Sequence, residues 1–564
     1  MKLIKNENGF SIADESVQFD FGSERIPQPH DGLFRLEVVG RAPTPHIKAG
    51  DRLLLPIDEG IAITAEKEYE SGVFDCNWIK GMFCSRQGTM SMIIVERAKK
   101  YLLICLDDGI HSEYSAKKEN GLYQLEIRCH QQCGVTYGIF ASLAEACRAY
   151  RKIKNCAVIP LREKLRKNPE IEKLIGGAIF WIWNEHYDEV MYSETDTDVS
   201  AAVGSDLLSV ADELHKNGVD RAMIGLFFRA DSPLSEDLYR KYGYISTQYD
   251  NYNDVLNPDM LQIIPNNRVK NCDYTFRRMK DYPDGVQVNE DGSLTDAWAL
   301  KGFDGKFHHQ KTLCPLVAAE RMGTEIPEIM KEFPYYRGRF IDVYGTGLSK
   351  CFSKAHPLTR EACRTVKNDA FQAIEDMGLI AGTEDGFEDL INHLVYTEGL
   401  HSPVYFRISN AGRKHAHIYN EEQTEHIRKY MLNPECRVPL WYLVYHDSLL
   451  AFPYWGDSTE MSMEWISKKI LFACLYGCPP LYSFSVKDFD RLKDNILSSY
   501  RKITEVHQKV ALLPMTNFEI LRDDYQVQRS VFGNQYEVVV NFSSENYIYH
   551  NRCIRPDDLL FAEI

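Results

Sequence analysis

The spacing of apolar and polar residues divides the chain into four parts. Up to residue 150, short alternating or β-branched runs at 33–39, 52–56, 91–95, 102–106 and 123–128 are separated by Gly, Asp and Asn clusters. This pattern is typical of an all-β fold, and we predict an N-terminal β-sandwich over residues 1–150. Between 151 and 175, Leu, Lys, Arg and Glu recur at helical spacing, which predicts a helical connector.

From residue 176 onward, apolar β-like segments alternate with helical ones. We expect strands at 177–183, 222–228, 243–248, 340–344, 379–383, 440–445 and 479–484, and helices at 205–217, 236–242, 359–377, 387–394, 461–475 and 486–507. Strand followed by helix, repeated over about 320 residues, predicts a (β/α)8-type barrel across 176–507. An open doubly wound sheet is the alternative, disfavoured because no Gly-rich phosphate loop follows the first strand. Alternation resumes after 508 and predicts a small C-terminal β domain over 508–564, so the predicted fold class is α/β.

Polar residues just after each predicted strand are the candidates for chemistry, because a β/α barrel places its active site at the carboxyl ends of its strands. Most of the candidates are carboxylates and aromatics. They are Arg229, Asp231, Tyr249, Asp250, Asn251, Asn253, Asp342, Glu384, Asp385, His446 and Asp447.

Asp342 is the least expected of these residues, since Ile341 and Val343 flank it and burying a carboxylate in a strand is costly. It could instead cap a helix or pair with Arg337 or Arg339. For Glu384 the alternative is a charge at the start of the helix expected at 387, although Asp385 or Thr383 suits that capping role better.

For His446 the alternative is a neutral core histidine bonded to a backbone carbonyl. The neighbouring Asp447 favours a functional role, since the pair could contact sugar hydroxyls.

Two carboxylates at the ends of neighbouring strands, with aromatic residues nearby, are what retaining glycoside hydrolysis requires. One attacks the anomeric carbon, and the other donates a proton to the leaving oxygen and then activates water. The two groups should stand about 5 to 5.5 Å apart. Neighbouring strands, about 4.8 Å apart, bring Asp342 and Glu384 into that range.

Charge and composition narrow the class of partner. The 564 residues include 65 Lys and Arg against 81 Asp and Glu, a net charge of −16, which argues against nucleic acid or an anionic membrane as the main partner. Aromatic residues make up 12% of the chain, with 32 Tyr, and their flat apolar faces suit sugars. The sequence does not indicate an oligomeric state.

The N-terminal residues and the cysteines suggest a cytoplasmic protein, and we expect no cofactor. Residues 1–16 lack the apolar run of a secretory signal, and no apolar stretch approaches the roughly 18 residues of a membrane span. The 15 cysteines, odd in number and without a CxxC pair, indicate reduced thiols. Cys129 and Cys133 flank a His-Gln-Gln sequence, but no second ligand pair follows, so we expect no metal site.

Two motifs resemble those of a known group. Phe340-Ile341-Asp342-Val343-Tyr344-Gly345, then a helix, then Gly382-Thr383-Glu384-Asp385-Gly386, resemble the catalytic core of glycoside hydrolase families 101 and 129, whose members release α-linked N-acetylgalactosamine. The resemblance implies Asp342 as nucleophile, Glu384 as acid/base, and a β-sandwich, a barrel and a C-terminal β domain. The smaller, intracellular style of family 129 fits better, and the similarity extends over residues 176–485.

The chain departs from these families at several positions. Tyr344 replaces the usual Trp, Asp385 stands where an aromatic is typical, and the helix between the motifs is longer. Trp298 resembles an aromatic of the loop that closes over substrate in family 101, or else packs on the barrel rim. These departures affect the predicted sugar more than the predicted reaction.

The predicted function is therefore a retaining exo-acting hydrolase of α-linked N-acetylgalactosamine or galactose. The alternatives are an α-galactosidase, a transglycosidase or a phosphorylase of the same architecture, and a sugar-binding barrel without catalysis. The predicted substrate-binding residues are Asp231, Tyr249, Asp250, Asn251, Trp298, Tyr344, Asp385, His446 and Asp447.

Overall fold

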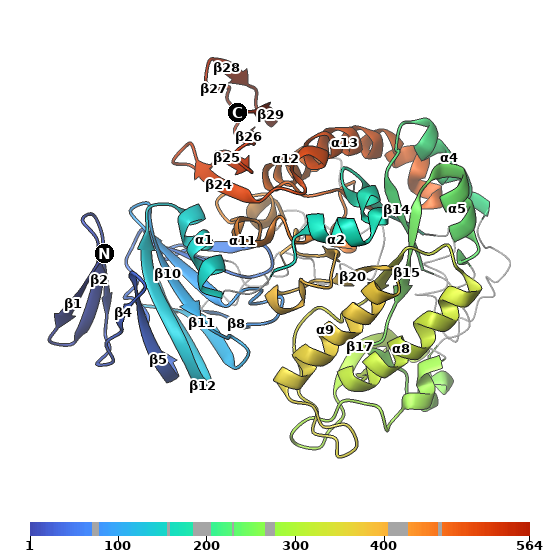
Figure 1. The fold of residues 1–564 in the computed structure, drawn as a ribbon, viewed down its shortest axis with the longest axis horizontal. Coiled ribbons are helices and arrows are strands. Elements are labelled where there is room, and N and C mark those ends of the chain that lie inside the picture. Colours follow the sequence, from blue (N-terminus) through green and yellow to red (C-terminus); the bar gives the residue numbers. More distant parts are fainter. Residues whose placement is uncertain are drawn as a thin grey trace.

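The computed structural model describes residues 1–69, 78–154, 158–183, 205–227, 231–264, 277–403, 427–460 and 465–564. It consists of antiparallel sheets at each end of the chain and a parallel barrel between them (Figure 1). The predicted fold class, a (β/α)8-type barrel flanked by β structure, is confirmed.

Nine strands from the described part of the first 140 residues form one antiparallel sheet. The order is β4-β5-β12-β10-β9-β6-β7, with β11 paired to β12 and β8 to β11, and β1-β2-β3 form a separate sheet. Strand β12 changes register between Cys129 and Cys133, the pair that the sequence had suggested as possible metal ligands. The strands are β1 (Lys2–Asn6), β2 (Gly9–Ala13), β3 (Gln18–Phe21), β4 (Gln28–His30), β5 (Leu33–Ala42), β6 (Arg52–Leu55), β7 (Ile61–Thr64), β8 (Trp78–Met82), β9 (Met92–Arg97), β10 (Lys100–Leu106), β11 (Ser112–Glu119) and β12 (Leu122–Phe140).

Helices α1 (Leu143–Lys154) and α2 (Leu161–Lys167) and the 3-10 helix η1 (Pro169–Leu174) connect this sheet to the barrel. Helix α1 packs against β10 and β12 and also against α11 (Leu440–Tyr445) and β24 (Met515–Ile520). The connector therefore contacts both end regions of the chain.

Eight described strands, all parallel, form a nearly closed barrel in the order β22-β21-β20-β19-β15-β14-β13-β23. The ends of this order, β22 and β23, are joined by other contacts. The backbone N–H of Thr459 donates to Leu481, and the Glu460 carboxylate accepts from Ser483 N–H. The strands are β13 (Ala178–Trp183), β14 (Ala222–Leu226), β15 (Ile245–Asp250), β19 (Gly338–Ile341), β20 (Ile380–Glu384), β21 (Tyr396–Glu398), β22 (Leu450–Phe452) and β23 (Leu481–Ser485).

Helices and a small sheet fill the connections between barrel strands. The three-stranded sheet β16-β18-β17 lies in the long connection between β15 and β19. The elements are α4 (Ser205–Lys216), α5 (Leu234–Tyr242), β16 (Asp254–Val255), η3 (Pro258–Gln262), η4 (Met279–Asp281), β17 (Asp296–Lys301), β18 (Phe307–Thr312), α8 (Pro315–Glu332), α9 (Arg360–Asp376), η5 (Glu388–Leu390), the π-helical turn η7 (Ile427–Met431), η8 (Trp455–Asp457), α12 (Ile466–Tyr476), η9 (Val486–Asp488) and α13 (Phe489–Val510).

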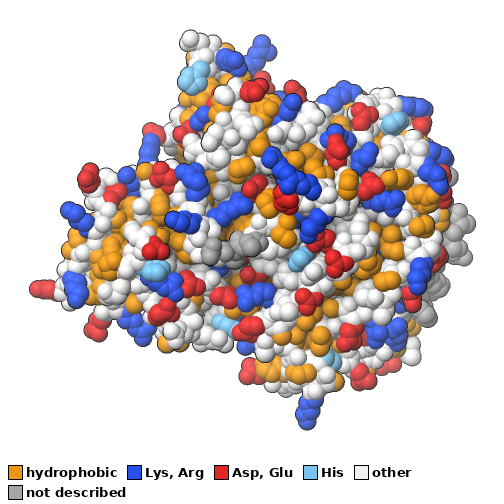
Figure 2. Space-filling model, in the orientation of Figure 1, with side chains coloured by type: hydrophobic (Ala, Val, Ile, Leu, Met, Phe, Trp, Pro, Cys, Tyr) orange, Lys and Arg blue, Asp and Glu red, His pale blue; other side chains and the backbone are white. Residues whose placement is uncertain are grey.

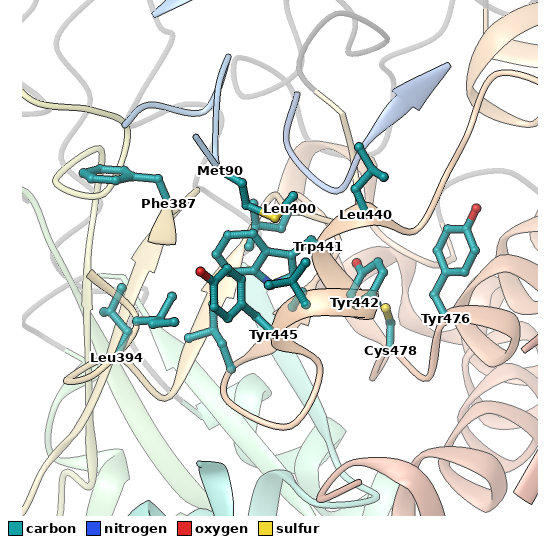
Figure 3. Packing of buried hydrophobic residues seen from close by; sticks show 14 of the residues in the cluster. Met90, Phe387, Leu394, Leu400, Leu440, Trp441, Tyr442, Tyr445, Tyr476 and Cys478 are labelled. Carbon is teal, nitrogen blue, oxygen red and sulfur yellow. The ribbon is translucent and has the colours of Figure 1, made fainter. Parts of the chain in front are cut away.

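Two predicted segments are wrong. Residues 440–445, expected as a strand, form helix α11, and its six side chains are all buried. Trp441 and Tyr445 pack there with Met90 of the N-terminal region and with Phe387 and Leu400 (Figure 3). The helix expected at 387–394 is reduced to the 3-10 turn η5, and β21 and β22 were not predicted.

The chain ends in two antiparallel sheets, β24-β25-β26-β29 and β27-β28. Strand β26 packs on α12, and β24 packs on α1 and α11. The strands are β24 (Met515–Ile520), β25 (Val527–Phe532), β26 (Tyr536–Asn541), β27 (Tyr547–Tyr549), β28 (Arg552–Ile554) and β29 (Asp558–Glu563).

Aromatic rings fill the barrel interior. Trp181, Tyr249, Phe340 and Tyr396 belong to one buried cluster, and glycines on neighbouring strands make room for two of them. A Cβ at Gly225 would stand 2.1 Å from the Trp181 ring, and one at Gly382 would stand 2.1 Å from the Tyr396 ring. These glycines let the rings cross the barrel below the ends of the strands.

The surface carries both signs of charge. Lys, Arg, Asp and Glu side chains are interspersed over the face seen in Figure 2. None of the helices described in the structure combines the length and apolar character needed to cross a membrane.

Candidate active site

Asp342 and Glu384 occupy neighbouring positions at the carboxyl ends of β19 and β20. The register pairs Ile341 with Thr383, and each acid is the next residue along the chain, Asp342 just after β19 and Glu384 as the last residue of β20. Phe340, two residues before Asp342, packs in the barrel interior, and Gly382, two residues before Glu384, lies against the interior Tyr396 ring. Because strand side chains alternate between faces, both acids are on the inner face. They are 8% and 7% exposed.

Neutral donors from β15 and the residue after it hold Asp342. The Tyr249 hydroxyl donates to Asp342 Oδ2 at 2.5 Å, and Asn251 Nδ2 donates to the same oxygen at 3.2 Å. The Asn251 amide is itself fixed, since its oxygen accepts from the backbone N–H groups of Asn253 and Asp254. Two of the predicted substrate-binding residues, Tyr249 and Asn251, therefore orient the predicted nucleophile.

A third acid, Glu398, lies on the next strand and was missed by sequence reasoning. The register pairs it with Glu384, and it is fully buried. Trp181 Nε1–H donates to both carboxyl oxygens, at 3.1 and 2.9 Å. Burial raises the pKa of Glu398 well above its usual range, the Trp181 bond opposes that rise, and the charge of Glu384 adds to it. Burial therefore favours the protonated form of Glu398.

A left-handed residue follows each of the two predicted catalytic acids. Val343 has a φ of +49° and Asp385 a φ of +54°. Positive φ is rare for a β-branched residue, and such strain is concentrated at functional sites. The backbone thus turns away from each strand directly after the acid.

Asp231 and Trp298 belong to other connections of the barrel. Asp231 follows β14 and is 6% exposed, and burial raises its pKa to about 7. Trp298 lies on β17, and its large apolar side chain is 41% exposed. Arg229, the neighbour of Asp231 among the candidates, lies outside the described residues.

Asp250 and Tyr344 are placed away from the barrel interior, which corrects their predicted position. Asp250 is on the opposite face of β15 from Tyr249, where its carboxylate pairs with Arg339 at 3.3 Å. Tyr344 packs edge-on against Phe371, and its hydroxyl donates to the carbonyl of Pro315. Neither residue is assigned to the site.

Asp385, His446 and Asp447 also have structural partners. Asp385 pairs with Arg86 of the N-terminal region at 3.3 Å. The two ring nitrogens of His446 lie 2.6 and 3.2 Å from the backbone carbonyls of Leu513 and Gly477. This agrees with the alternative interpretation of His446 as a core histidine bonded to backbone carbonyls. Asp447 pairs with Arg151 at 2.8 Å. His446 and Asp447 were expected after a barrel strand, but they follow helix α11.

The sequence profile of glycosyl hydrolases related to the GH101 family, GH129, matches residues 410–531 of the chain. The chain is a glycoside hydrolase that resembles family 129. The matched residues include β22, β23 and α12, whereas Asp342 and Glu384 lie outside them, so their roles remain predictions. No curated protein sequence matches the chain.

Solved structures with a similar fold include α-N-acetylgalactosaminidase NagBb from Bifidobacterium bifidum. Its complex with GalNAc has a TM-score of 0.67 and 15% identity, over 100% of this chain and 91% of that one. The ligand-free form gives a TM-score of 0.67 and 16% identity, over 96% and 89%. A GH31 dextranase from Flavobacterium johnsoniae, complexed with glucose, gives 0.50 and 9%, over 100% and 71%. At these identities the likeness shows a shared fold.

Proposed function

We propose that the chain is a retaining, exo-acting glycosidase that releases α-linked N-acetylgalactosamine or galactose from glycans. The observation that carries the proposal is that Asp342 and Glu384 each directly follow one of the paired residues Ile341 and Thr383, at inner-face positions at the ends of β19 and β20. Adjacent strands stand about 4.8 Å apart, close to the separation of about 5 to 5.5 Å that a retaining pair needs.

In the proposed reaction, Asp342 attacks the anomeric carbon while Glu384 gives its proton to the departing glycosidic oxygen. The carbon–oxygen bond to the leaving group breaks as the bond to the Asp342 carboxylate forms. Glu384, now ionised, takes a proton from water, and the hydroxide attacks the same carbon and releases Asp342. Tyr249 and Asn251 both donate to Oδ2 of Asp342 and so orient its carboxylate.

An enzyme nucleophile is needed if the sugar is an α-N-acetylgalactosaminide. Its 2-acetamido group lies cis to the axial leaving group and cannot attack from the opposite side. Substrate-assisted hydrolysis is therefore not open to this substrate, and the Asp342 carboxylate supplies the attack.

The choice of sugar is supported by the fold of NagBb, whose structure holds GalNAc. Asp231, buried after β14, and Trp298, exposed on β17, are the residues that we assign to the sugar, as hydrogen-bonding and stacking groups. We further propose the division predicted from the sequence, with domains at 1–150, 176–507 and 508–564 joined by the connector at 151–175.

The test is a screen of nitrophenyl α- and β-glycosides, including α-N-acetylgalactosaminide and α-galactoside. We expect turnover of one or both α-glycosides and none of the β-anomers, with retention of anomeric configuration in the first-formed product by NMR. Preference for the α-galactoside would indicate an α-galactosidase, and transfer to added sugar acceptors would indicate a transglycosidase. An inverted product, or no turnover of any α-glycoside, would contradict the proposal.

Azide separates the two carboxylate roles. In Glu384→Ala, azide should restore turnover of an activated aryl α-glycoside and give the α-glycosyl azide, since it replaces water in the second step. In Asp342→Ala it should give the β-glycosyl azide, since it replaces the nucleophile. Rescue of neither variant would move the acid/base assignment to Asp385.

A further inference from the structure

Three side chains that can bind a metal lie buried together outside the barrel interior. The ligand atoms of Cys314, Cys351 and His356 are all within 4.8 Å of one another. Cys314 directly precedes α8, and the other two residues lie in the loop between β19 and α9. The three residues are 0%, 3% and 7% exposed.

The local geometry suits a tetrahedral ion. Cys351 Sγ and His356 Nδ1 are 3.4 Å apart. Two ligands bound to one zinc ion, at about 2.3 Å for sulfur and 2.0–2.1 Å for nitrogen, are separated by roughly 3.5 Å in a tetrahedral site. The pair therefore needs little movement to share an ion.

The second ring nitrogen of His356 has the partner that a metal-bound histidine usually has. Nε2 lies 2.7 Å from the backbone carbonyl of Asp284. A proton on Nε2 leaves the lone pair of Nδ1 directed at the cysteines, and such a bond to a carbonyl is the common outer support of a metal-ligating imidazole.

A fourth soft ligand lies close by. Cys363, in the first turn of α9, is fully buried and belongs to the same hydrophobic cluster as Cys314, Cys351 and Leu358. Its sulfur lies outside the group of ligand atoms within 4.8 Å of one another and would have to move toward them to bind. Three thiols and one imidazole form a ligand set typical of a closed, structural zinc site.

We propose that Cys314, Cys351, His356 and Cys363 bind one Zn²⁺ ion. Binding displaces the thiol protons, so the cysteines enter the site as thiolates. The sequence did not indicate this site because Cys314 lies far along the chain from Cys351, His356 and Cys363, and these three do not form a CxxC-type pair.

The ion would tie together the start of α8, the start of α9 and the loop that leaves β19 just after Asp342. Within that loop, Cys351 and Leu358 exchange two backbone hydrogen bonds of 2.9 Å and close a hairpin that contains His356. We infer a structural role, in which the ion fixes the chain that follows the predicted nucleophile and takes no part in the chemistry.

The first experiment measures metal content. Full-length protein is purified without chelators from zinc-supplemented cells, and zinc is measured by inductively coupled plasma mass spectrometry. We expect about one zinc per chain in the wild type and a background level in Cys351→Ser. Cys147→Ser is the matched control, since Cys147 is also a buried free cysteine but belongs to α1, outside the cluster, and should keep the metal.

Cobalt provides a second readout on the wild type, so the inference does not depend on the folding of Cys351→Ser. After removal of zinc by a chelator, titration with Co²⁺ should produce thiolate-to-cobalt charge-transfer bands and the visible bands of a tetrahedral ion. His356→Cys should retain these bands, His356→Ala should weaken binding, and Cys363→Ser should shift the visible bands. Unchanged bands in Cys363→Ser would overturn its assignment as the fourth ligand.

Three results would overturn the site as a whole. These are wild-type protein without zinc that also fails to bind Co²⁺, full zinc content in Cys351→Ser, and an intact mass lower by two hydrogen atoms under non-reducing conditions, which would indicate a Cys314–Cys351 disulfide. Support would come from a lower thermal unfolding midpoint after chelation, restored by added Zn²⁺.

Discussion

Carboxylates on the inner and outer faces of the barrel strands have different kinds of partner. On the inner face, the donors described at Asp342 are the Tyr249 hydroxyl and the Asn251 amide, and the donor at Glu398 is the Trp181 indole. On the outer face of β15, Asp250 pairs with the guanidinium of Arg339.

The same contrast holds elsewhere in the fold. Glu59 of the N-terminal region is paired with Arg437, and Asp457, in the connection after β22, is paired with Lys469 at 2.5 Å. A buried ion pair balances its own charge and holds elements together, whereas an acid held by neutral donors keeps its charge or proton for a ligand. The five predictions below test this contrast.

The largest effect is expected at the inner face. Asp342→Asn removes the proposed nucleophile but keeps the size of the side chain, so kcat/KM on the nitrophenyl α-glycoside should fall by about four orders of magnitude or more. Urea unfolding should show stability equal to the wild type. Near-normal activity would exclude Asp342 as the nucleophile.

Asp250→Asn is the matched change on the outer face of a neighbouring strand. It leaves the fully buried Arg339 cation without its carboxylate, so the free energy of unfolding should fall by about 3–5 kcal/mol. The kcat of the folded protein should stay near the wild-type value. If Asp250→Asn lost activity but kept the stability of the wild type, Asp250 would belong to the active site. The inner-face and outer-face acids would then not differ in role.

A buried acid held by neutral donors should make stability depend on pH. Glu460, 1% exposed, accepts from Ser458 and Ser483, and burial raises its pKa from 4.5 to about 7. Its contribution to stability is complete below pH 4.5 and is lost as the pH rises to 7. Over that window the unfolding free energy of the wild type should fall by about 3 kcal/mol relative to Glu460→Gln.

Chemical denaturation of both proteins at several pH values measures this difference. Because both proteins share every other titrating group, including Asp231, the comparison isolates Glu460. Parallel curves would show that folding does not raise the pKa of Glu460.

Tyr249→Phe tests the hydrogen bond that orients Asp342. Loss of a bond to a charged oxygen should lower kcat by about 10- to 100-fold, the equivalent of about 1.5–3 kcal/mol. KM should change little, because the hydroxyl acts on the nucleophile. The Tyr69→Phe variant, whose hydroxyl bonds to Thr64 in the N-terminal region, serves as the control for stability effects. A change in KM alone would instead indicate direct contact with the sugar.

The smallest effect is expected at Glu398. Gln has the shape of a protonated glutamic acid, so Glu398→Gln should leave kcat near the wild-type value, whereas Glu384→Gln on the adjacent strand should impair poor leaving groups strongly. A variant of Glu398 as inactive as that of Glu384 would show that Glu398 exchanges a proton during turnover. The prediction that Glu398 stays protonated throughout turnover would then be wrong.

Most of the barrel was predictable from sequence because most of its longer strands and helices alternate with clear periods, although the 18-residue helix α8 was not predicted. Strand β13 and helices α9 and α13 lie close to their predicted limits. Residues 440–445 were assigned to the wrong element because a short apolar run looks the same as a buried strand or a buried helix, and only its contacts with Met90 and Leu400 distinguish them. Strands β21 and β22, of three residues each, are too short for a periodic signal.

The site was predicted in part. The rule that selects polar residues at strand ends found Asp342 and Tyr249, but it could not distinguish the inner from the outer face, and so it also selected Asp250. Glu398 followed the same rule, since it ends β21 and precedes Gly399, but β21 itself was not recognised. The Cys and His cluster depends on contacts between distant segments, which the sequence does not show.

The left-handed residues after Asp342 and Glu384 limit how the protein can be altered. An insertion of one residue before either acid would move it to the outer face, because strand side chains alternate. The left-handed residues Val343 and Asp385 end each strand at a fixed position in the sequence. The height of each acid along the barrel axis is therefore fixed as well. Engineering of specificity is therefore best directed at the long connections, such as that carrying Trp298, while the length of β19 and β20 is left unchanged.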